Sequence, residues 1–171
     1  AGEILTDMIH ICQGIHPQQM KVLEIGCGAC RVTRALARRF GQVHAVDVSA
    51  EMIEQARRNL SGLPNVHLYV NNGMDLSPLP DIEFDFAFSS IVFQHIPSYE
   101  VIESYVREVH RLLRPGALFK FQVQGGLSEA PPPDDTWLGV SYTDEQAVAL
   151  AERCGFEPRY RVGAGEQYFW L

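Results

Sequence analysis

Two glycines and an acidic residue have the spacing of a nucleotide-binding site. Gly26 and Gly28 follow the β-prone run 21–25 and precede a strong helix former, residues 31–40. Glycines at such a turn let a ligand approach the backbone and the free N–H groups of the helix. Asp47 comes about 20 positions later, at a strand end, where a carboxylate can accept both ribose hydroxyls. The alternative is a tight structural turn with a solvated Asp47.

The charges around this turn favour a zwitterionic ligand over a dinucleotide. A dinucleotide places its pyrophosphate at the turn and uses a third glycine, where this chain has Arg31. Glu24 would repel a phosphate by about 4 kcal/mol at 4 Å with an effective dielectric near 20. S-adenosylmethionine fits instead, because Glu24 can face its ammonium and Arg31 its carboxylate. NAD is therefore disfavoured; the alternative is that both residues are exposed charges at element ends.

The turn also contains a Cys-x-x-Cys pattern, Cys27 and Cys30. This spacing resembles a redox dithiol, but a thioredoxin-type site would have Trp where Gly26 precedes the pair. A chain of 171 residues can bury a core without disulfides, so Cys12 and Cys154 also read as reduced thiols. A dithiol redox enzyme is the weaker hypothesis.

The rest of the sequence alternates strand and helix patterns, which predicts an α/β fold. Ser49 and Ser98 are expected helix N-caps, and Arg114-Pro115-Gly116 an expected turn. The final β-prone runs are joined by Gly163-Ala-Gly165, which predicts a hairpin. The predicted strands are 21–25, 43–48, 66–70, 84–91, 117–123, 156–162 and 167–171; the predicted helices are 31–40, 50–60, 99–113 and 143–154.

One domain, 1–171, accounts for this pattern, with an N-terminal helix in 1–16 and a lid-like insertion at 124–142. Trp137 and Tyr142 would offer aromatic walls to an acceptor pocket there.

Composition narrows the partners. The formal net charge of −7 disfavours nucleic acid, and no apolar run approaches the roughly 20 residues of a membrane span. The chain shows no leader pattern, so we expect a cytoplasmic protein.

Four segments together resemble class I S-adenosylmethionine-dependent methyltransferases of the small single-domain, type 11-like kind. They are Val22-Leu-Glu-Ile-Gly-Cys-Gly28, Val46-Asp-Val-Ser49, the stretch 79–85 and Leu112-Leu-Arg-Pro-Gly116, in the family's order. The resemblance covers essentially the whole chain. It implies a three-layer Rossmann-like sandwich whose seven-stranded, mostly parallel sheet has an antiparallel last strand.

The resemblance also implies roles for single residues. Glu24 would lie near the methionyl ammonium, Asp47 on the ribose, and the turn 72–74 at the adenine. Two positions depart from the family pattern: Cys30 replaces a third glycine, and Asn72 replaces an Asp for which Asp75 is a shifted alternative. The full predicted cofactor set is Glu24, Gly26, Cys27, Gly28, Arg31, Asp47, Val48, Met52, Asn72, Gly73, Met74, Ser89 and Ser90.

The predicted activity is methyl transfer from S-adenosyl-L-methionine to a small-molecule acceptor. His95, in the loop after the fourth strand, is a candidate general base, with a hydrogen-bonded packing role as the alternative. No Asn-Pro-Pro-Tyr or Asp-Pro-Pro-Tyr motif and no metal-ligand spacing occurs, which disfavours amide-type and base N-methylation and metal-assisted transfer. A non-catalytic adenosyl-binding protein of the same fold is the competing hypothesis.

Overall fold

The structure, a computed structural model, describes residues 8–126 and 139–171. The chain divides into two compact units, Ala1–Phe88 with Leu112–Leu118 and Ser89–Arg111 with Phe119–Leu171. The helix expected in 1–16 is represented by α1 (Met8–Cys12). Trp137 and most of the expected lid fall outside the described residues.

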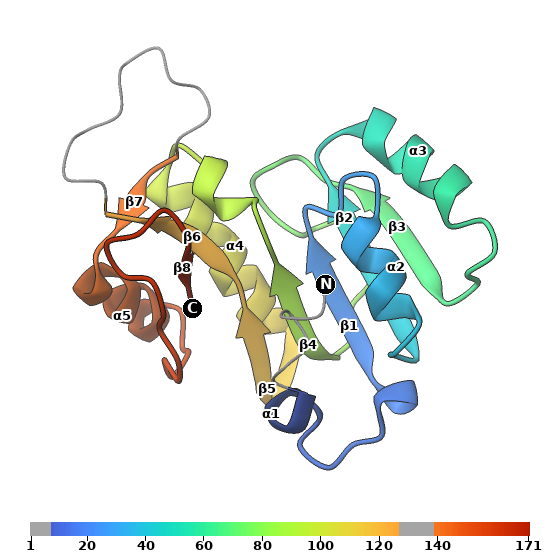
Figure 1. The fold of residues 1–171 in the computed structure, drawn as a ribbon, viewed down its shortest axis with the longest axis horizontal. Coiled ribbons are helices and arrows are strands. Elements are labelled where there is room, and N and C mark those ends of the chain that lie inside the picture. Colours follow the sequence, from blue (N-terminus) through green and yellow to red (C-terminus); the bar gives the residue numbers. More distant parts are fainter. Residues whose placement is uncertain (1–7, 127–138) are drawn as a thin grey trace. The chain divides into compact units, whose positions relative to one another are not determined.

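A five-stranded parallel sheet forms the centre of the first unit (Figure 1). The strand order is β3-β2-β1-β4-β5, so β2 and β3 extend the sheet on one side of β1, and β4 and β5 extend it on the other side. Ligands of open α/β sheets bind outside the carboxyl ends of the strands at such a switch point. The strands are β1 (Lys21–Ile25), β2 (Gln42–Asp47), β3 (Val66–Val70), β4 (Phe84–Ser89) and β5 (Leu113–Lys120).

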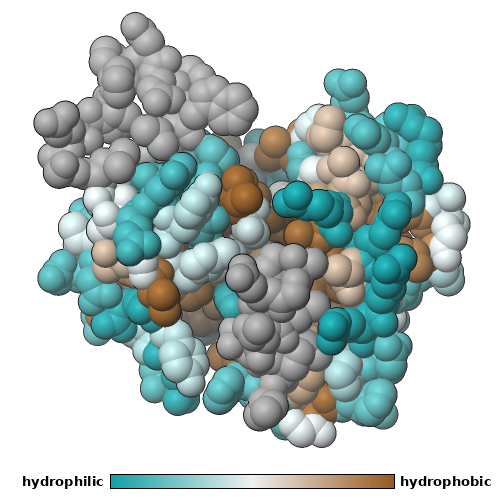
Figure 2. Space-filling model, viewed as in Figure 1, coloured by the Kyte–Doolittle hydropathy of each residue, from teal (hydrophilic) through white to brown (hydrophobic). Residues whose placement is uncertain are grey.

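Two helices accompany the first three strands. They are α2 (Arg31–Ala37), which follows the short 3-10 turn η2 (Pro17–Gln19) and β1, and α3 (Ala50–Asn59). Ser49 caps α3 as predicted, because its hydroxyl accepts the Met52 N–H at 3.2 Å. Figure 2 shows hydrophilic side chains over the outer side of these helices. The inner side of α3 joins a buried cluster with the glycine turn and β2, made of Cys27, Cys30, Ala45, Ile53, Ala56 and Leu60.

His44 is a buried titratable group of β2, with only 4% of its surface exposed. Its Nδ1 lies 2.9 Å from the Tyr69 hydroxyl, and its ring meets those of His67 and Phe84 at centroid distances of 4.5 and 5.2 Å. Burial, together with the charges of His67 and Lys21, lowers the pKa of His44 to about 4. The folded protein therefore favours the neutral imidazole.

This pKa predicts a loss of stability in acid. The unfolded chain takes up the His44 proton near pH 6.5 and the folded chain only near pH 4, so stability falls as the pH drops through this window. We expect His44→Phe to remove about 3 kcal/mol of that pH dependence, as measured by urea unfolding at each pH. Tyr69→Phe, which keeps the imidazole, should retain it. A His44→Phe profile parallel to wild type would contradict the assignment.

The second unit has its own three-stranded sheet, ordered β7-β6-β8. The last strand runs antiparallel to β6, as predicted. Thr143 is the N-cap of the helix Asp144–Arg153 and forms a reciprocal capping box with Gln146. The elements are η3 (Phe93–His95), α4 (Tyr99–Leu112), β6 (Gln122–Gly125), β7 (Ser141–Tyr142), α5 (Asp144–Arg153) and β8 (Phe169–Trp170).

The prediction of one seven-stranded sheet does not match the strands of the described residues. The expected strand 117–123 is interrupted at Phe121, whose backbone N–H and C=O both bond to Leu171, at 3.0 and 2.8 Å. Those bonds belong to the small sheet, so the ladder divides into a sheet of five strands and a sheet of three.

Two local predictions need correction. The expected turn Arg114-Pro115-Gly116 lies inside β5, an edge strand of its sheet, where a proline lacking an N–H is tolerated. The expected hairpin of 156–162 and 167–171 is reduced to a single antiparallel bridge between Val162 and Trp170. Trp170 lies in β8, which makes its ladder with β6 instead.

Candidate cofactor site

The glycine turn after β1 is held against the end of β2. The N–H groups of Gly26 and Cys27 both donate to the Val46 carbonyl, at 2.8 and 3.0 Å. Gly26 and Gly28 have φ values of +75° and +50°, a region that side chains with a Cβ rarely adopt. The turn therefore depends on these two glycines for its conformation.

Asp47 ties the glycine turn to the start of α3. Its Oδ2 accepts the Gly28 N–H at 2.7 Å, and its Oδ1 accepts the Ser49 N–H at 2.9 Å. A carboxylate oxygen has two lone pairs, so each oxygen retains capacity for a hydroxyl donor. Asp47, the residue predicted to bind the ribose, is thus held in position at the carboxyl end of β2.

Glu24 is the most unusual charged residue of this unit. It is 3% exposed, and its Oε2 is buried without a hydrogen-bond partner. Burial raises the pKa of Glu24 to about 8, although the Thr33 hydroxyl acts in the opposite direction. A buried carboxyl group with an unused oxygen is costly, and a cationic ligand would offset that cost. Thr33 is not among the predicted site residues; the signal that could have indicated it is a hydroxyl within the apolar stripe of a helix.

The predicted adenine end carries exposed apolar side chains. Val48, directly after the end of β2, is 61% exposed, and Met74, beyond the end of β3, is 60% exposed. A Cβ on Gly73 would meet Val48 Cγ1 at 3.4 Å, so the turn 72–74 lies against Val48. Exposed apolar groups at a strand end suit the flat face of a base.

The side-chain amide of Asn72, predicted to bind the adenine, makes hydrogen bonds within the turn itself. Its Oδ1 accepts the N–H groups of Met74 and Asp75, at 2.8 and 3.0 Å, and its Nδ2 donates to Asp75 Oδ2. The oxygen expected to accept from adenine is therefore engaged in holding the turn. Asp75 in turn accepts the Ser77 N–H at 3.0 Å.

The remaining first-unit candidates are distributed around α2 and α3. Arg31 is the exposed first residue of α2, and Met52 is half-buried in the first turn of α3. Cys30, at the position of the family's third glycine, is the N-cap of α2 with φ +69° and ψ +35°. Glycine is common there because this left-handed conformation costs other residues roughly 1–2 kcal/mol.

The other candidates, Ser89, Ser90 and His95, belong to the second unit. Gln94 Nε2 lies 3.0 Å from His95 Nε2, and the amide donates, so this imidazole nitrogen is the acceptor. Gln122 donates to Gln94 Oε1 and accepts the Ile91 N–H at 3.1 Å. This chain of amides orients His95, and no periodic pattern in the sequence predicts it.

Tyr142, the described member of the predicted aromatic walls, is 2% exposed and packs edge-on to Tyr99 at 5.1 Å. It borders a cavity of about 220 Å³ with Tyr99, Gln146, Ala149 and Arg153.

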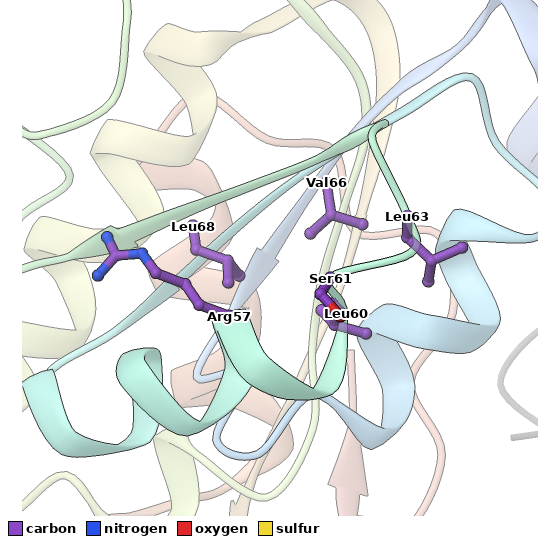
Figure 3. A pocket seen from close by; sticks show the side chains of 6 residues that line it. All are labelled: Arg57, Leu60, Ser61, Leu63, Val66 and Leu68. Carbon is purple, nitrogen blue, oxygen red and sulfur yellow. The ribbon is translucent and has the colours of Figure 1, made fainter.

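A cavity of about 260 Å³ lies elsewhere on the first unit (Figure 3). It is situated where α3 ends and β3 begins, away from the carboxyl ends of the strands, so it is not part of the candidate site. Arg57, Leu60, Ser61, Leu63, Val66 and Leu68 line it.

The described residues, 8–126 and 139–171, hold neither a metal-ligand cluster nor a membrane-spanning helix. No group of three or more His, Cys, Asp or Glu side chains there could hold a metal ion. Within the same ranges no helix has the length and apolar character to cross a membrane.

Known proteins share this sequence pattern and fold. A malonyl-[acyl-carrier protein] O-methyltransferase of Enterobacter lignolyticus is 32% identical over 101 residues, covering 59% of this chain and 38% of the relative. A demethylmenaquinone methyltransferase of Staphylococcus epidermidis is 30% identical over 113 residues, covering 64% and 45%. The chain thus spans less than half the length of these curated relatives.

Solved structures of methyltransferases share the fold of this chain. The solved structure of an S-adenosylmethionine-dependent methyltransferase from Clostridium acetobutylicum superposes with a TM-score of 0.76 at 15% identity, covering 99% of this chain and 89% of that one. The family model described as "Methyltransferase domain" matches residues 23–121, more than half of the chain and the whole of the glycine turn and Asp47. This chain is therefore a member of the methyltransferase domain family, which has a Rossmann-like α/β fold and uses S-adenosyl-L-methionine.

Proposed function

We propose that this protein transfers a methyl group from S-adenosyl-L-methionine to a small-molecule acceptor. The observation that carries the proposal is the buried, unpartnered Oε2 of Glu24 beside a glycine turn whose Gly28 N–H is held by Asp47. A carboxylate there suits an ammonium group and opposes a phosphate, which separates this cofactor from a dinucleotide.

Each end of the cofactor has residues of fitting chemistry. Glu24 would accept hydrogen bonds from the methionyl ammonium, and Arg31 would pair with the carboxylate. Asp47 would accept the ribose hydroxyls, and Val48 with the Gly73 turn would pack on the adenine. When bound, the cofactor supplies an electrophilic methyl group on its sulfonium. The chain's own contribution is binding and alignment for in-line transfer.

The acceptor class rests on the relatives. Their names specify a malonyl-[acyl-carrier protein] and a demethylmenaquinone, so a carboxyl group on a carrier and a quinone-type ring are the first acceptors to test. Ser89, Ser90 and His95 are proposed to serve the acceptor step and the methyl end of the cofactor. His95 Nε2 accepts a hydrogen bond from Gln94 Nε2, which orients the imidazole ring.

Product formation tests this proposal directly. The protein is incubated with methyl-labelled S-adenosylmethionine and either a malonyl thioester or a demethylated naphthoquinol, and each acceptor is analysed by mass spectrometry. We expect one acceptor class to gain a methyl group, in step with S-adenosylhomocysteine release. Cofactor binding without transfer to any acceptor would support a non-catalytic adenosyl-binding protein; absence of binding would reject both readings.

His95→Ala separates an acceptor role from a cofactor role. We expect its S-adenosylhomocysteine affinity to stay within about threefold of wild type, because His95 is not among the residues predicted to bind the cofactor. Transfer to an identified acceptor should slow by roughly a hundredfold if the imidazole acts as a base. Gln94→Leu is the matched positioning variant, whose pH–rate profile should shift. Loss of cofactor binding in folded His95→Ala would contradict this placement, and unchanged transfer would exclude the base.

A further inference from the structure

The two cysteines of the glycine turn are close enough to react with each other. The Cys30 N–H donates to the Cys27 carbonyl at 2.8 Å and closes a four-residue turn. Such turns bring their end Cα atoms within about 7 Å, and disulfides span Cα separations of roughly 4.4–6.8 Å. Both residues are free thiols, and both belong to the buried cluster beneath α3.

The two thiols have unequal acidities. Hydrogen bonding from Cys27 lowers the pKa of Cys30 to about 7, and Arg34 acts in the same direction. The same interaction, with burial, raises the pKa of Cys27. Cys30 is therefore the nucleophile of the pair and Cys27 its proton-bearing partner, the division of roles that a dithiol needs for oxidation.

The turn leaves room for a small oxidant. A Cβ on Gly28, one of the two residues between the cysteines, would meet no atom within 4 Å, so the space beside Gly28 is open. The thiols themselves are only 6% and 1% exposed, which favours a molecule the size of water over a bulky disulfide reagent.

We propose that Cys27 and Cys30 form a peroxide-sensitive dithiol whose disulfide disables the cofactor turn. The Cys30 thiolate attacks hydrogen peroxide, takes one oxygen as a sulfenic acid and, with a proton, releases water. Cys27 sulfur then displaces the hydroxyl of that sulfenic acid as a second water. Two thiols and one peroxide thus give one disulfide and two waters, and a reducing dithiol reverses the change.

The consequence for the cofactor follows from Gly28. Its N–H is bonded to Asp47 Oδ2 at 2.7 Å, and its carbonyl lies 3.8 Å from the Cys30 sulfur. A covalent sulfur–sulfur bond of about 2.05 Å draws the flanking residues together and displaces this peptide from Asp47. This effect rests on the proposed function, whereas formation of the disulfide does not.

Mass spectrometry and calorimetry together test the proposal. In a Cys12→Ser, Cys154→Ser background the protein is treated with hydrogen peroxide, alkylated and digested with trypsin, which releases residues 22–31 as one peptide. We expect that peptide to lose its two thiol hydrogens and resist alkylation. S-adenosylhomocysteine affinity should fall at least roughly tenfold and return with dithiothreitol, and bound S-adenosylhomocysteine should oppose disulfide formation by the same factor.

Cys30→Gly is the control, because glycine adopts φ +69° without strain and removes the nucleophile. Its affinity should not respond to peroxide. Thiols of 22–31 that remain alkylatable after peroxide would overturn the proposal, and a disulfide that leaves affinity unchanged would overturn its effect on the cofactor turn. Protein that forms the disulfide yet never binds S-adenosylhomocysteine would refute the proposed function instead, so the two failures are distinguishable.

Discussion

Replacing Glu24 with Gln should stabilise the free protein and weaken its cofactor binding at the same time. The buried carboxyl group has a pKa of about 8 in the folded chain against 4.5 for its ordinary value, so the folded state holds a proton that the unfolded state has released. Folding stability from this group is present below pH 4.5 and is lost as the pH rises towards 8. Glutamine has no proton to lose.

The stabilisation of Glu24→Gln should therefore grow between about pH 5 and pH 8 and reach roughly 2–4 kcal/mol. Within this range, from about pH 6 to pH 7.5, the wild-type affinity for S-adenosylhomocysteine should rise, because the ammonium requires the ionised carboxylate. The variant should bind roughly ten- to a hundredfold more weakly and lose that slope. Thermal unfolding and calorimetry at each pH measure both effects.

Glu83→Gln is the matched control, since Glu83 is an exposed residue of the same unit. It should change neither quantity. A Glu24→Gln protein that is less stable than wild type at pH 8, or that binds with wild-type affinity, would contradict the assignment of Glu24 as a buried carboxyl group for the ammonium.

Asp47→Ala should weaken S-adenosylhomocysteine binding by roughly ten- to a hundredfold. The carboxylate would lose its hydrogen bonds to the ribose, and it would also release the N–H groups of Gly28 and Ser49, which it holds at 2.7 and 2.9 Å. Asp47→Asn keeps one acceptor oxygen, so its affinity for S-adenosylhomocysteine should lie between those of wild type and Asp47→Ala.

Calorimetric titration of wild type and both variants measures this series. Thermal unfolding without ligand checks that Asp47→Ala remains folded. Equal affinity in folded Asp47→Ala would exclude the ribose assignment, while leaving that of Glu24 in place.

The sequence predicted the first unit well because its local signals agree with each other. The alternation of β-prone runs and capped helices from 21 to 70 predicted β1 to β3, and the Ser49 cap lies where expected. The spacing from the glycine turn to Asp47 also translated into the contact between Gly28 and Asp47, because parallel neighbouring strands align their carboxyl ends.

Other features could not be inferred because they depend on contacts distant in sequence. The break at Phe121 arises from bonds to Leu171, 50 positions along the chain, and no local pattern encodes it. The engagement of the Asn72 oxygen by two backbone N–H groups depends on the closed turn. Burial, not residue type, gives Glu24 its raised pKa, so the sequence could predict its role but not its protonation.

Titration of S-adenosylhomocysteine and of NAD into the wild-type protein tests the central claim most directly. Glu24 would lie near a dinucleotide's pyrophosphate, and Arg31 stands where such a site has its third glycine. We predict saturable heat with S-adenosylhomocysteine and far weaker binding of NAD. Tight NAD binding, with neither heat nor thermal shift from S-adenosylhomocysteine, would contradict the assignment of this site to S-adenosylmethionine.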